Sequence, residues 1–315
     1  MPAPRGARPG RREPAAAREP NGLVIGAHGR HYVVEDRETG AVVLCHPRGK
    51  RSDCVVGDHV HWETSGDGGV IEQAAERRNL LYRQDEWKTK SFAANIDQLL
   101  VLLAVEPMYA ETQAARALIA AAHAGVQALL VLNKIDLPGV DAARARLQPY
   151  RDMGVEVLEC AIKGRPDEAH ALLAPRLAGQ VTLVLGPSGM GKSTLINRMI
   201  PDAQAQVGEI SQALNSGRHT TTTTRWYWMD EHHREAALID SPGFQEFGLR
   251  QVPAADLARW MPDFAAHAGE CRFHNCSHLH EPGCAVRAAF ERGLISAPRY
   301  RIYQELHAEL SATRW

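Results

Sequence analysis

The sequence has no run of about 18 consecutive apolar residues, which is the length that a membrane-spanning helix needs. It also has almost no net charge, because 36 Lys and Arg residues stand against 37 Asp and Glu residues. A chain balanced in this way has no general attraction for nucleic acid or for a membrane, so any RNA contact must come from local patches. With 315 residues, 44% of them hydrophobic, the chain is expected to form two or three globular domains.

The first 20 residues lack an apolar core, which excludes a secretory signal peptide. They are rich in Pro, Ala and Arg and contain no serine, which argues against an organellar transit peptide. We predict a disordered basic arm over residues 1–20.

Residues 21–83 have the pattern of short β-strands. Stretches such as LVIGAHGRHYVVE, AVVLCH and GGVIEQ carry β-branched residues and are separated by Gly, Pro and Asp. Four or five such strands predict a small barrel, and periodicity alone does not separate an OB-fold from an SH3-like barrel.

After a predicted linker, DEWKTKSFAAN, strands alternate with helices. DQLLVLLAV is a continuous apolar run, typical of a strand buried on both faces, and ALLVLNK, VEVLECA, VTLVLG, TRWYWM and AALIDSPG are further strand candidates. This alternation predicts a parallel α/β sheet with right-handed crossovers. Beyond residue 249 the pattern is of short helices, beginning with ADLARWMPDFAAH.

The strand VTLVLG runs into GPSGMGKS, which fits the phosphate-binding pattern GxxxxGK[ST], and a helix follows. Gly186 and Gly191 let the backbone curl so that its N–H groups face phosphate oxygens. We expect Lys192 to bind the β- and γ-phosphates and the hydroxyl of Ser193 to bind Mg²⁺.

NKID follows the strand ALLVL, at the sheet end where open parallel sheets bind ligands. The carboxylate of Asp136 can accept both N–H groups of the guanine edge, a donor pair that adenine lacks. Asn133 is expected to brace the loops and the stem of Lys134 to cover the base. A backbone N–H at Cys160 or Ala161 is the candidate donor to guanine O6.

DSPG, at the end of the strand AALI, places Asp240 to hold Mg²⁺ through water and the Gly243 N–H to sense the γ-phosphate. In most GTPases the phosphate loop comes first, whereas here NKID precedes GPSGMGKS. The motif order is circularly permuted, and a permuted chain can rebuild the same site in space.

A cluster of metal-binding residues follows, with Cys271, Cys276 and Cys284 grouped around His278. Three thiolates and one imidazole predict a closed, structural Zn²⁺ site rather than a catalytic one. His274 and His280 are close in sequence, so the residues alone leave the imidazole ligand open.

The permuted order, GRHTTTT, DSPGF and the Cys/His cluster together resemble the ribosome small-subunit-dependent GTPase A family, often called RsgA or YjeQ. The resemblance implies an OB-fold, a permuted GTPase domain and a C-terminal zinc domain. It also implies slow GTP hydrolysis, stimulated by the small ribosomal subunit during the late maturation of that subunit, and rRNA binding. It selects His278 as the zinc ligand. The nucleotide-contacting residues that it implies are Asn133, Lys134, Ile135, Asp136, Gly186, Pro187, Ser188, Gly189, Met190, Gly191, Lys192, Ser193 and Thr194.

GRHTT, at residues 217–221, resembles the first switch of the family, in which Thr220 or Thr221 would reach Mg²⁺ and the γ-phosphate. Many GTPases have a water-orienting glutamine after the DxxG glycine, but this chain has Phe244, and an apolar ring cannot orient water. Intrinsic hydrolysis should therefore be slow, and His219 is the candidate within the chain for the missing group.

We accordingly expect a multidomain, cytoplasmic monomer with no membrane partner, which uses GTP, Mg²⁺ and one structural Zn²⁺ and binds the small ribosomal subunit and its rRNA. The expected division is an arm at 1–20, an OB-fold at 21–88, the GTPase domain at 89–250 and the zinc-binding helical domain at 251–315. Cations at 46–51, at 76–79 and in the C-terminal helices are candidates for RNA contact, none of them assigned individually.

Two other functions fit parts of this pattern. The first is a P-loop ATPase or kinase in which NKID is incidental. The second is a non-catalytic RNA-binding module that holds nucleotide only as a structural ligand.

Overall fold

The computed structural model of the chain describes residues 19–49, 53–84, 89–201, 203, 224–230, 234–241 and 248–312. Residues 1–18 of the predicted arm lie outside this set, as do four predicted site residues and the phenylalanine after DSPG, namely His219, Thr220, Thr221, Gly243 and Phe244. Within the described ranges, no helix is both long enough and apolar enough to cross a membrane.

The N-terminal strands close into a five-stranded barrel. They are β1 (Gly22–His28), β2 (His31–Asp36), β3 (Val42–Pro47), β4 (His59–Ser65) and β5 (Gly68–Ala74). β1 pairs with both β2 and β4, and the ring closes through β2–β3, a parallel β3–β5 pair and β5–β4. This order is that of an OB-fold, which confirms the expected barrel and decides between the two barrel types.

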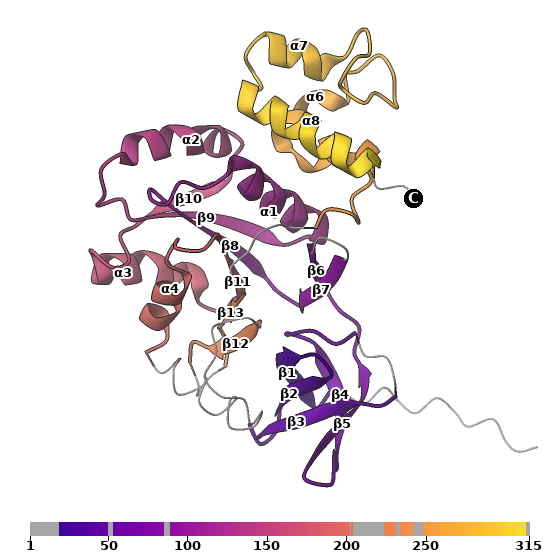
Figure 1. The fold of residues 1–315 in the computed structure, drawn as a ribbon, viewed down its shortest axis with the longest axis vertical. Coiled ribbons are helices and arrows are strands. Elements are labelled where there is room, and N and C mark those ends of the chain that lie inside the picture. Colours follow the sequence, from indigo (N-terminus) through magenta and orange to yellow (C-terminus); the bar gives the residue numbers. More distant parts are fainter. Residues whose placement is uncertain are drawn as a thin grey trace, which may run out of the picture.

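The central sheet has the order β10-β9-β8-β11-β13-β12 and is parallel except for β12. Its strands are β8 (Gln98–Ala104), β9 (Gln127–Asn133), β10 (Glu156–Glu159), β11 (Val181–Leu185), β12 (Arg225–Trp228) and β13 (Ala237–Asp240). Helices α1 (Glu111–Ala124) and α2 (Val140–Asp152) cover one face, and α3 (Pro166–Leu177) and α4 (Lys192–Met199) cover the other (Figure 1). Chain connections leave β8 and β11 in opposite directions, so a topological switch point lies between these two strands.

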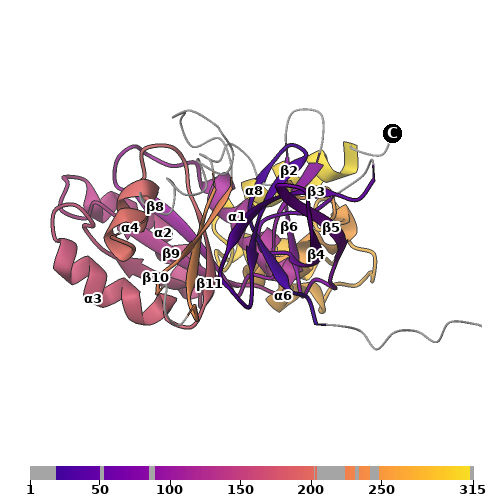
Figure 2. The same ribbon diagram turned by 90° about the horizontal axis from the view of Figure 1, so that it is seen from below.

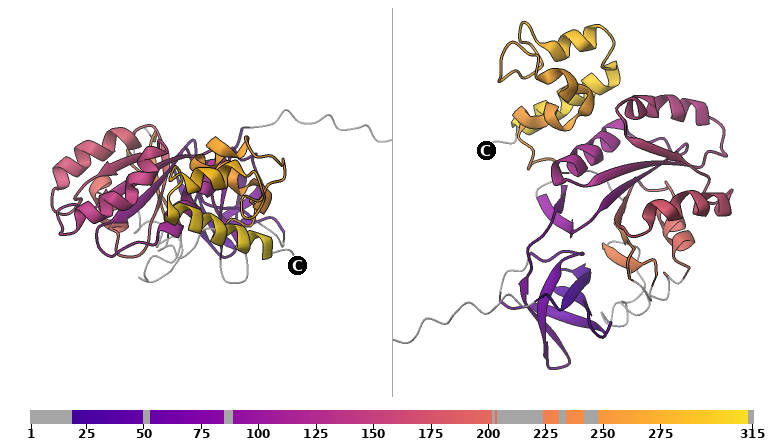
Figure 3. Two further views of the ribbon diagram at one scale, coloured as in Figure 1. Left: turned by 90° about the horizontal axis from the view of Figure 1, so that it is seen from above. Right: turned by 180° about the vertical axis from the view of Figure 1, so that it is seen from behind.

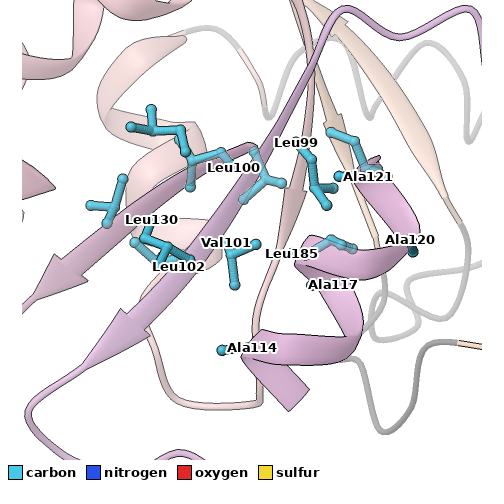
Figure 4. Close-up of a cluster of buried hydrophobic side chains, with 14 of the residues drawn as sticks. Leu99, Leu100, Val101, Leu102, Ala114, Ala117, Ala120, Ala121, Leu130 and Leu185 are labelled. Atoms are coloured by element: carbon cyan, nitrogen blue, oxygen red, sulfur yellow. The ribbon is translucent and has the colours of Figure 1, made fainter. Parts of the chain in front are cut away.

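Strand β8 lies at the centre of the hydrophobic core, and all seven of its residues are buried. The small side chains of Ala114, Ala117 and Ala121 on α1 let this helix pack closely against β8 (Figure 4). The continuous apolar run predicted this burial, because a strand covered by helices on both faces has no polar side.

A short hairpin replaces much of the predicted linker. β6 (Leu80–Gln84) pairs antiparallel with β7 (Thr89–Ala94). Two asparagines fix its open end: the side chain of Asn79 accepts a hydrogen bond from the Ile96 N–H at 3.0 Å, and that of Asn95 accepts one from the Arg78 N–H at 2.8 Å.

Strand β12 joins the central sheet to the barrel, because it pairs with β13 on one side and with β1 on the other. A buried carboxylate supports this junction: Glu35 on β2 accepts hydrogen bonds from Trp228 Nε1 at 3.0 Å and from Arg234 at 2.9 Å. Seen from below, the barrel and the α3–α4 pair occupy separate parts of the molecule (Figure 2).

The C-terminal part is helical, with the 3₁₀ helix η1 (Ala254–Trp260) followed by α6 (Pro262–Ala268), α7 (Ala285–Glu291) and α8 (Ala297–Ala312). The predicted helical segment ADLARWMPDFAAH is thus divided at Pro262, which begins α6 because proline is suited to a first helical turn. The side chain of Arg299 forms an ion pair with Asp263 at 2.8 Å and lies 5.3 Å from the ring of Tyr150 on α2. These helices and the barrel lie at opposite ends of the α/β domain (Figures 1 and 3).

Candidate functional site

The phosphate loop, residues 186–193, connects β11 to α4 and requires glycine at two places. Gly186 has φ 155°, and a Cβ there would lie 2.2 Å from the carbonyl oxygen of Leu102 on β8. Gly191 has φ 107°, and its Cβ would lie 2.5 Å from Nδ2 of Asn133. Both positions combine a left-handed backbone with close packing, so no other residue fits them without rearrangement.

Lys192 closes the loop on itself. Its Nζ donates to the carbonyl oxygens of Gly186 at 2.7 Å and Pro187 at 3.0 Å. Burial lowers the pKa of Lys192, and the nearby Asp240 carboxylate opposes that change. The ammonium group is therefore held inside the site, where an anionic ligand would be a better partner than neutral carbonyls.

Asn133 connects the base-side loops to the phosphate loop. Its side chain is buried, with Nδ2 donating to Met190 O at 2.8 Å and Oδ1 accepting from the Ile162 N–H at 3.0 Å. The neighbouring Lys134 extends along the loop, and its Nζ donates to Gly189 O at 2.8 Å. Segments that follow β9, β10 and β11 are thus held together by two adjacent side chains.

These segments enclose a cavity of about 520 Å³, a size that suits a nucleotide-sized ligand. It lies at the carboxyl ends of the parallel strands, beside the topological switch point. The cavity is lined by Asn133, Lys134, Asp136, Leu137, Ile162, Lys163, Gly164, Ser188, Gly189, Gly191, Lys192, Ser193, Thr194, Asp240 and Ser241.

Six predicted nucleotide contacts do not line this cavity, namely Ile135, Cys160, Ala161, Gly186, Pro187 and Met190. Cys160 and Ala161 are buried, and burial raises the pKa of the Cys160 thiol to about 12. The next three residues, 162–164, face the cavity instead. None of these three residues was predicted from the sequence, although they form the turn that follows β10, at the end of the sheet where ligands bind.

Asp240, the last residue of β13, is only 6% exposed. Burial raises its pKa to about 6, against the opposing attraction of Lys192 and Arg225. The adjacent Ser241 hydroxyl donates to Val184 O at 3.0 Å, which ties the end of β13 to β11. Because Lys192 and Arg225 do not fully offset the cost of burying this carboxylate, the site suits an additional cation. The oxygen donors of Asp240 and Ser193 are of the kind that Mg²⁺ prefers.

Replacing Asp240 by asparagine should stabilise the nucleotide-free protein above pH 6. The folded pKa of about 6 lies above the value of about 3.9 in an unfolded chain, so the folded state holds a proton that the unfolded state has lost. The free energy of unfolding of the wild type therefore falls as pH rises through this window. An amide has no charge to desolvate, and the gain at pH 8 should be about 1 to 3 kcal/mol.

Thermal denaturation of both proteins between pH 4 and 8 checks this expectation. The difference in Tm should shrink towards pH 4, where Asp240 is protonated in the folded wild type. A difference that does not change with pH, or an asparagine variant less stable than the wild type at pH 8, would contradict it.

The C-terminal cluster brings together Cys271, Cys276, His278 and Cys284, with all ligand atoms within 4.8 Å of one another. Cys271 Sγ lies 3.5 Å from His278 Nδ1 and 3.9 Å from Cys284 Sγ. Zinc bonds of about 2.3 Å to sulfur and about 2.0 Å to nitrogen give tetrahedral edges of about 3.5 to 3.8 Å. The four groups therefore fit one zinc ion, and neither His274 nor His280 belongs to the group.

The loop that carries these ligands is fixed by α8. The hydroxyl of Tyr300 donates to His278 O at 2.7 Å, and that of Tyr303 donates to Ser277 O at 2.9 Å. The carboxylate of Glu281 accepts from the Ser277 N–H at 2.9 Å. His278 needs such support because its backbone has φ 61°, a conformation that is uncommon for a residue with a side chain.

Comparison with known proteins matches residues 74–250 to the model of the RsgA GTPase family. Over 300 residues, 94% of each chain, the sequence is 56% identical to the small ribosomal subunit biogenesis GTPase RsgA of Variovorax paradoxus. It is 54% identical to the protein of the same name from Burkholderia pseudomallei, over 92% of each chain.

Two solved structures share the fold along nearly the whole length. YjeQ from Thermotoga maritima has a TM-score of 0.69 at 27% identity and covers 93% of this chain and 99% of its own. YloQ, described as a circularly permuted GTPase, has a TM-score of 0.67 at 25% identity over 95% of this chain and 97% of its own. The permuted motif order agrees with the description of YloQ, and the family match together with these relatives shows that the chain belongs to the RsgA GTPase family.

Proposed function

We propose that this chain binds guanine nucleotide in the 520 Å³ cavity and hydrolyses GTP in the biogenesis of the small ribosomal subunit. The observation that carries the proposal is the position of Asn133, whose side chain bonds to the phosphate loop and to the turn after β10. Because of these two hydrogen bonds, a phosphate site and a base site face one cavity despite the permuted order of their motifs.

Four of the cavity residues would contact the nucleotide or its Mg²⁺. The Asp136 carboxylate, exposed at the base end, would accept the two guanine N–H groups. Lys192 would exchange the carbonyls of Gly186 and Pro187 for phosphate oxygens. Ser193 and Asp240 would hold Mg²⁺, which neutralises the charge that develops on the phosphates when it is bound.

The donor to guanine O6 belongs to the turn after β10. Cys160 and Ala161 were expected here, but residues 162–164 line the cavity, and we infer that the donor is one of their backbone amides. The Ile162 N–H is already used by Asn133, which leaves the N–H groups of Lys163 and Gly164 as the candidate donors.

The switch residues stay part of this proposal. Thr220 or Thr221 would complete the Mg²⁺ and γ-phosphate contacts, the Gly243 N–H would sense the γ-phosphate, and His219 would help to position water. The segment with Thr220 precedes β12 and the segment with Gly243 follows β13, and these two strands pair with each other. The described residues at the ends of these strands, Arg225 and Asp240, pair with each other, and Asp240 lines the cavity, which supports placing both switch segments in this proposal.

The four-part division at residues 20, 88 and 250 is likewise proposed, with a zinc ion that stabilises the C-terminal helices. The ribosomal partner is taken from the names of the relatives, small ribosomal subunit biogenesis GTPase RsgA. rRNA contact, a cytoplasmic location, a monomeric state and the lack of a membrane partner belong to the same proposal.

Purified protein should hydrolyse GTP slowly, and purified small ribosomal subunits should raise the rate by about tenfold or more, as partner proteins do for other GTPases. The physical reason is Phe244, which cannot orient the attacking water, so a group outside the resting site must do so. The measurement is phosphate release at saturating GTP, with and without subunits.

Lys192→Ala serves as the control for contaminating hydrolysis, because it removes the cation on the phosphates, and this partly buried side chain lies inside the phosphate loop. Equal rates with and without subunits would contradict the activation, and hydrolysis that persists in Lys192→Ala would contradict the assigned site.

A further inference from the structure

Gly164, in the turn between β10 and α3, makes an unusually close approach to Asp136. A Cβ built at residue 164 would lie 2.4 Å from Oδ2 and 3.0 Å from Cγ of Asp136. Both residues line the nucleotide cavity. The carboxylate therefore occupies space that any residue other than glycine would fill with its own side chain.

The backbone of Gly164 does not itself require glycine. Its φ lies outside the left-handed range, unlike that of Gly186 at 155° or Gly191 at 107°. The turn is closed by a hydrogen bond from the Arg165 N–H to Ala161 O at 2.7 Å, which an alanine at residue 164 would leave intact. Steric clearance for Asp136 is thus the property that glycine supplies at this place.

The atoms that would be displaced are the exposed end of a flexible side chain. Asp136 can rotate away from a new methyl group at little cost to folding, but the rotation moves its carboxylate from its place at the base end of the cavity. A substitution at residue 164 should therefore lower nucleotide affinity without lowering the stability of the fold. The reason is that it displaces the charged acceptor of the guanine hydrogen bonds, whose strength depends on geometry.

We propose that Gly164 is a specificity-positioning residue, which keeps the space beside Asp136 clear so that the carboxylate faces the guanine N1 and N2 groups. This inference rests on the proposed function, since it concerns how the same cavity selects its base. Gly164 acts through Asp136 and needs no contact of its own with the nucleotide.

The test is Gly164→Ala, with GDP, IDP and ADP affinities measured by calorimetry. We expect GDP affinity to fall about 10- to 100-fold, because the lost bonds are made to a charged acceptor. IDP lacks the 2-amino group and should lose less, so the preference for GDP over IDP should shrink. The Tm should stay within about 2 °C of the wild type, and Gly269→Ala, whose Cβ would meet nothing within 4 Å, should change neither affinity nor Tm.

A double-mutant cycle with Asp136→Ala shows whether Gly164 affects GDP affinity by positioning Asp136 or by a general disturbance of the cavity. If Gly164 acts through Asp136, adding Gly164→Ala to Asp136→Ala should change GDP affinity less than about twofold. Independent, multiplying losses would overturn the inference, as would a Gly164→Ala protein that keeps its GDP affinity and its GDP/IDP preference. A wild type that binds GDP and ADP equally would instead overturn the proposed function, and this inference with it.

Discussion

Replacing Asp136 by asparagine should lower the affinity for GDP by about 100-fold or more, because one amide donor would then face the guanine donors. The same change should favour xanthine nucleotides, since xanthine carries an oxygen at C2 and can accept from the new amide. Competition of GDP and XDP against a fluorescent guanine nucleotide measures both effects on one protein.

Asp141→Asn is the matched control for this experiment. Its side chain is 93% exposed on α2 and forms an exposed ion pair with Arg144 across one helical turn, at 3.1 Å. It should leave GDP affinity unchanged. An equal loss in the two variants, or Asp136→Asn with wild-type base preference, would show that the base is selected elsewhere.

Loss of the zinc ligands should unfold the C-terminal helices. Structural zinc sites contribute about 10 to 16 kcal/mol, which is comparable with the whole stability of a typical domain at about 5 to 15 kcal/mol. Cys284→Ser removes a buried thiolate that also accepts the Arg287 N–H at the start of α7. We expect the variant to contain almost no zinc and to lose near-UV circular dichroism from its tyrosines.

Cys54→Ser is the comparison, because this half-buried cysteine belongs to the barrel and is outside the four-ligand group. It should retain zinc at the wild-type level by elemental analysis. Full zinc content and an unchanged Tm in Cys284→Ser would contradict the assignment of the cluster.

The parts of the fold that local pattern determines were predictable. The continuous apolar run of β8 predicts a buried strand, and the alanine-rich segment of α1 predicts a helix that packs against it. The second strand of the β6–β7 hairpin lies in the stretch expected as a linker, because DEWKTKSFAAN is mostly polar, whereas β6 falls almost wholly in the stretch expected to form strands. Leu81 is 1% exposed, and Asn79 and Asn95 fix the hairpin from positions outside the strands.

Contacts between distant segments could not be read from periodicity. β12 pairs with β1, although most strands of the barrel and of the central sheet lie between them in the sequence. Glu35 on β2 contacts Trp228 and Arg234 only because this pairing brings the two regions together. No local pattern encodes such a pairing.

Within the site, motif residues were predictable because each chemical task needs a particular side chain at a fixed spacing. Lys192, Asp136 and Asp240 all line the cavity. The guanine O6 donor was predicted at Cys160 or Ala161, whereas residues 162–164 line the cavity, and a backbone amide leaves no mark on the sequence because any side chain permits it. The clearance at Gly164 depends on the path of a neighbouring loop, which sequence does not specify.

The proposed function requires a single pocket that binds phosphates at one end and guanine at the other. A crystal structure of the protein with GDP and Mg²⁺ tests this most directly. We expect the diphosphate on the backbone amides of residues 188–193 and the guanine N1 and N2 atoms within hydrogen-bond reach of the Asp136 carboxylate. A nucleotide bound with its base turned away from Asp136, or outside the cavity altogether, would contradict it.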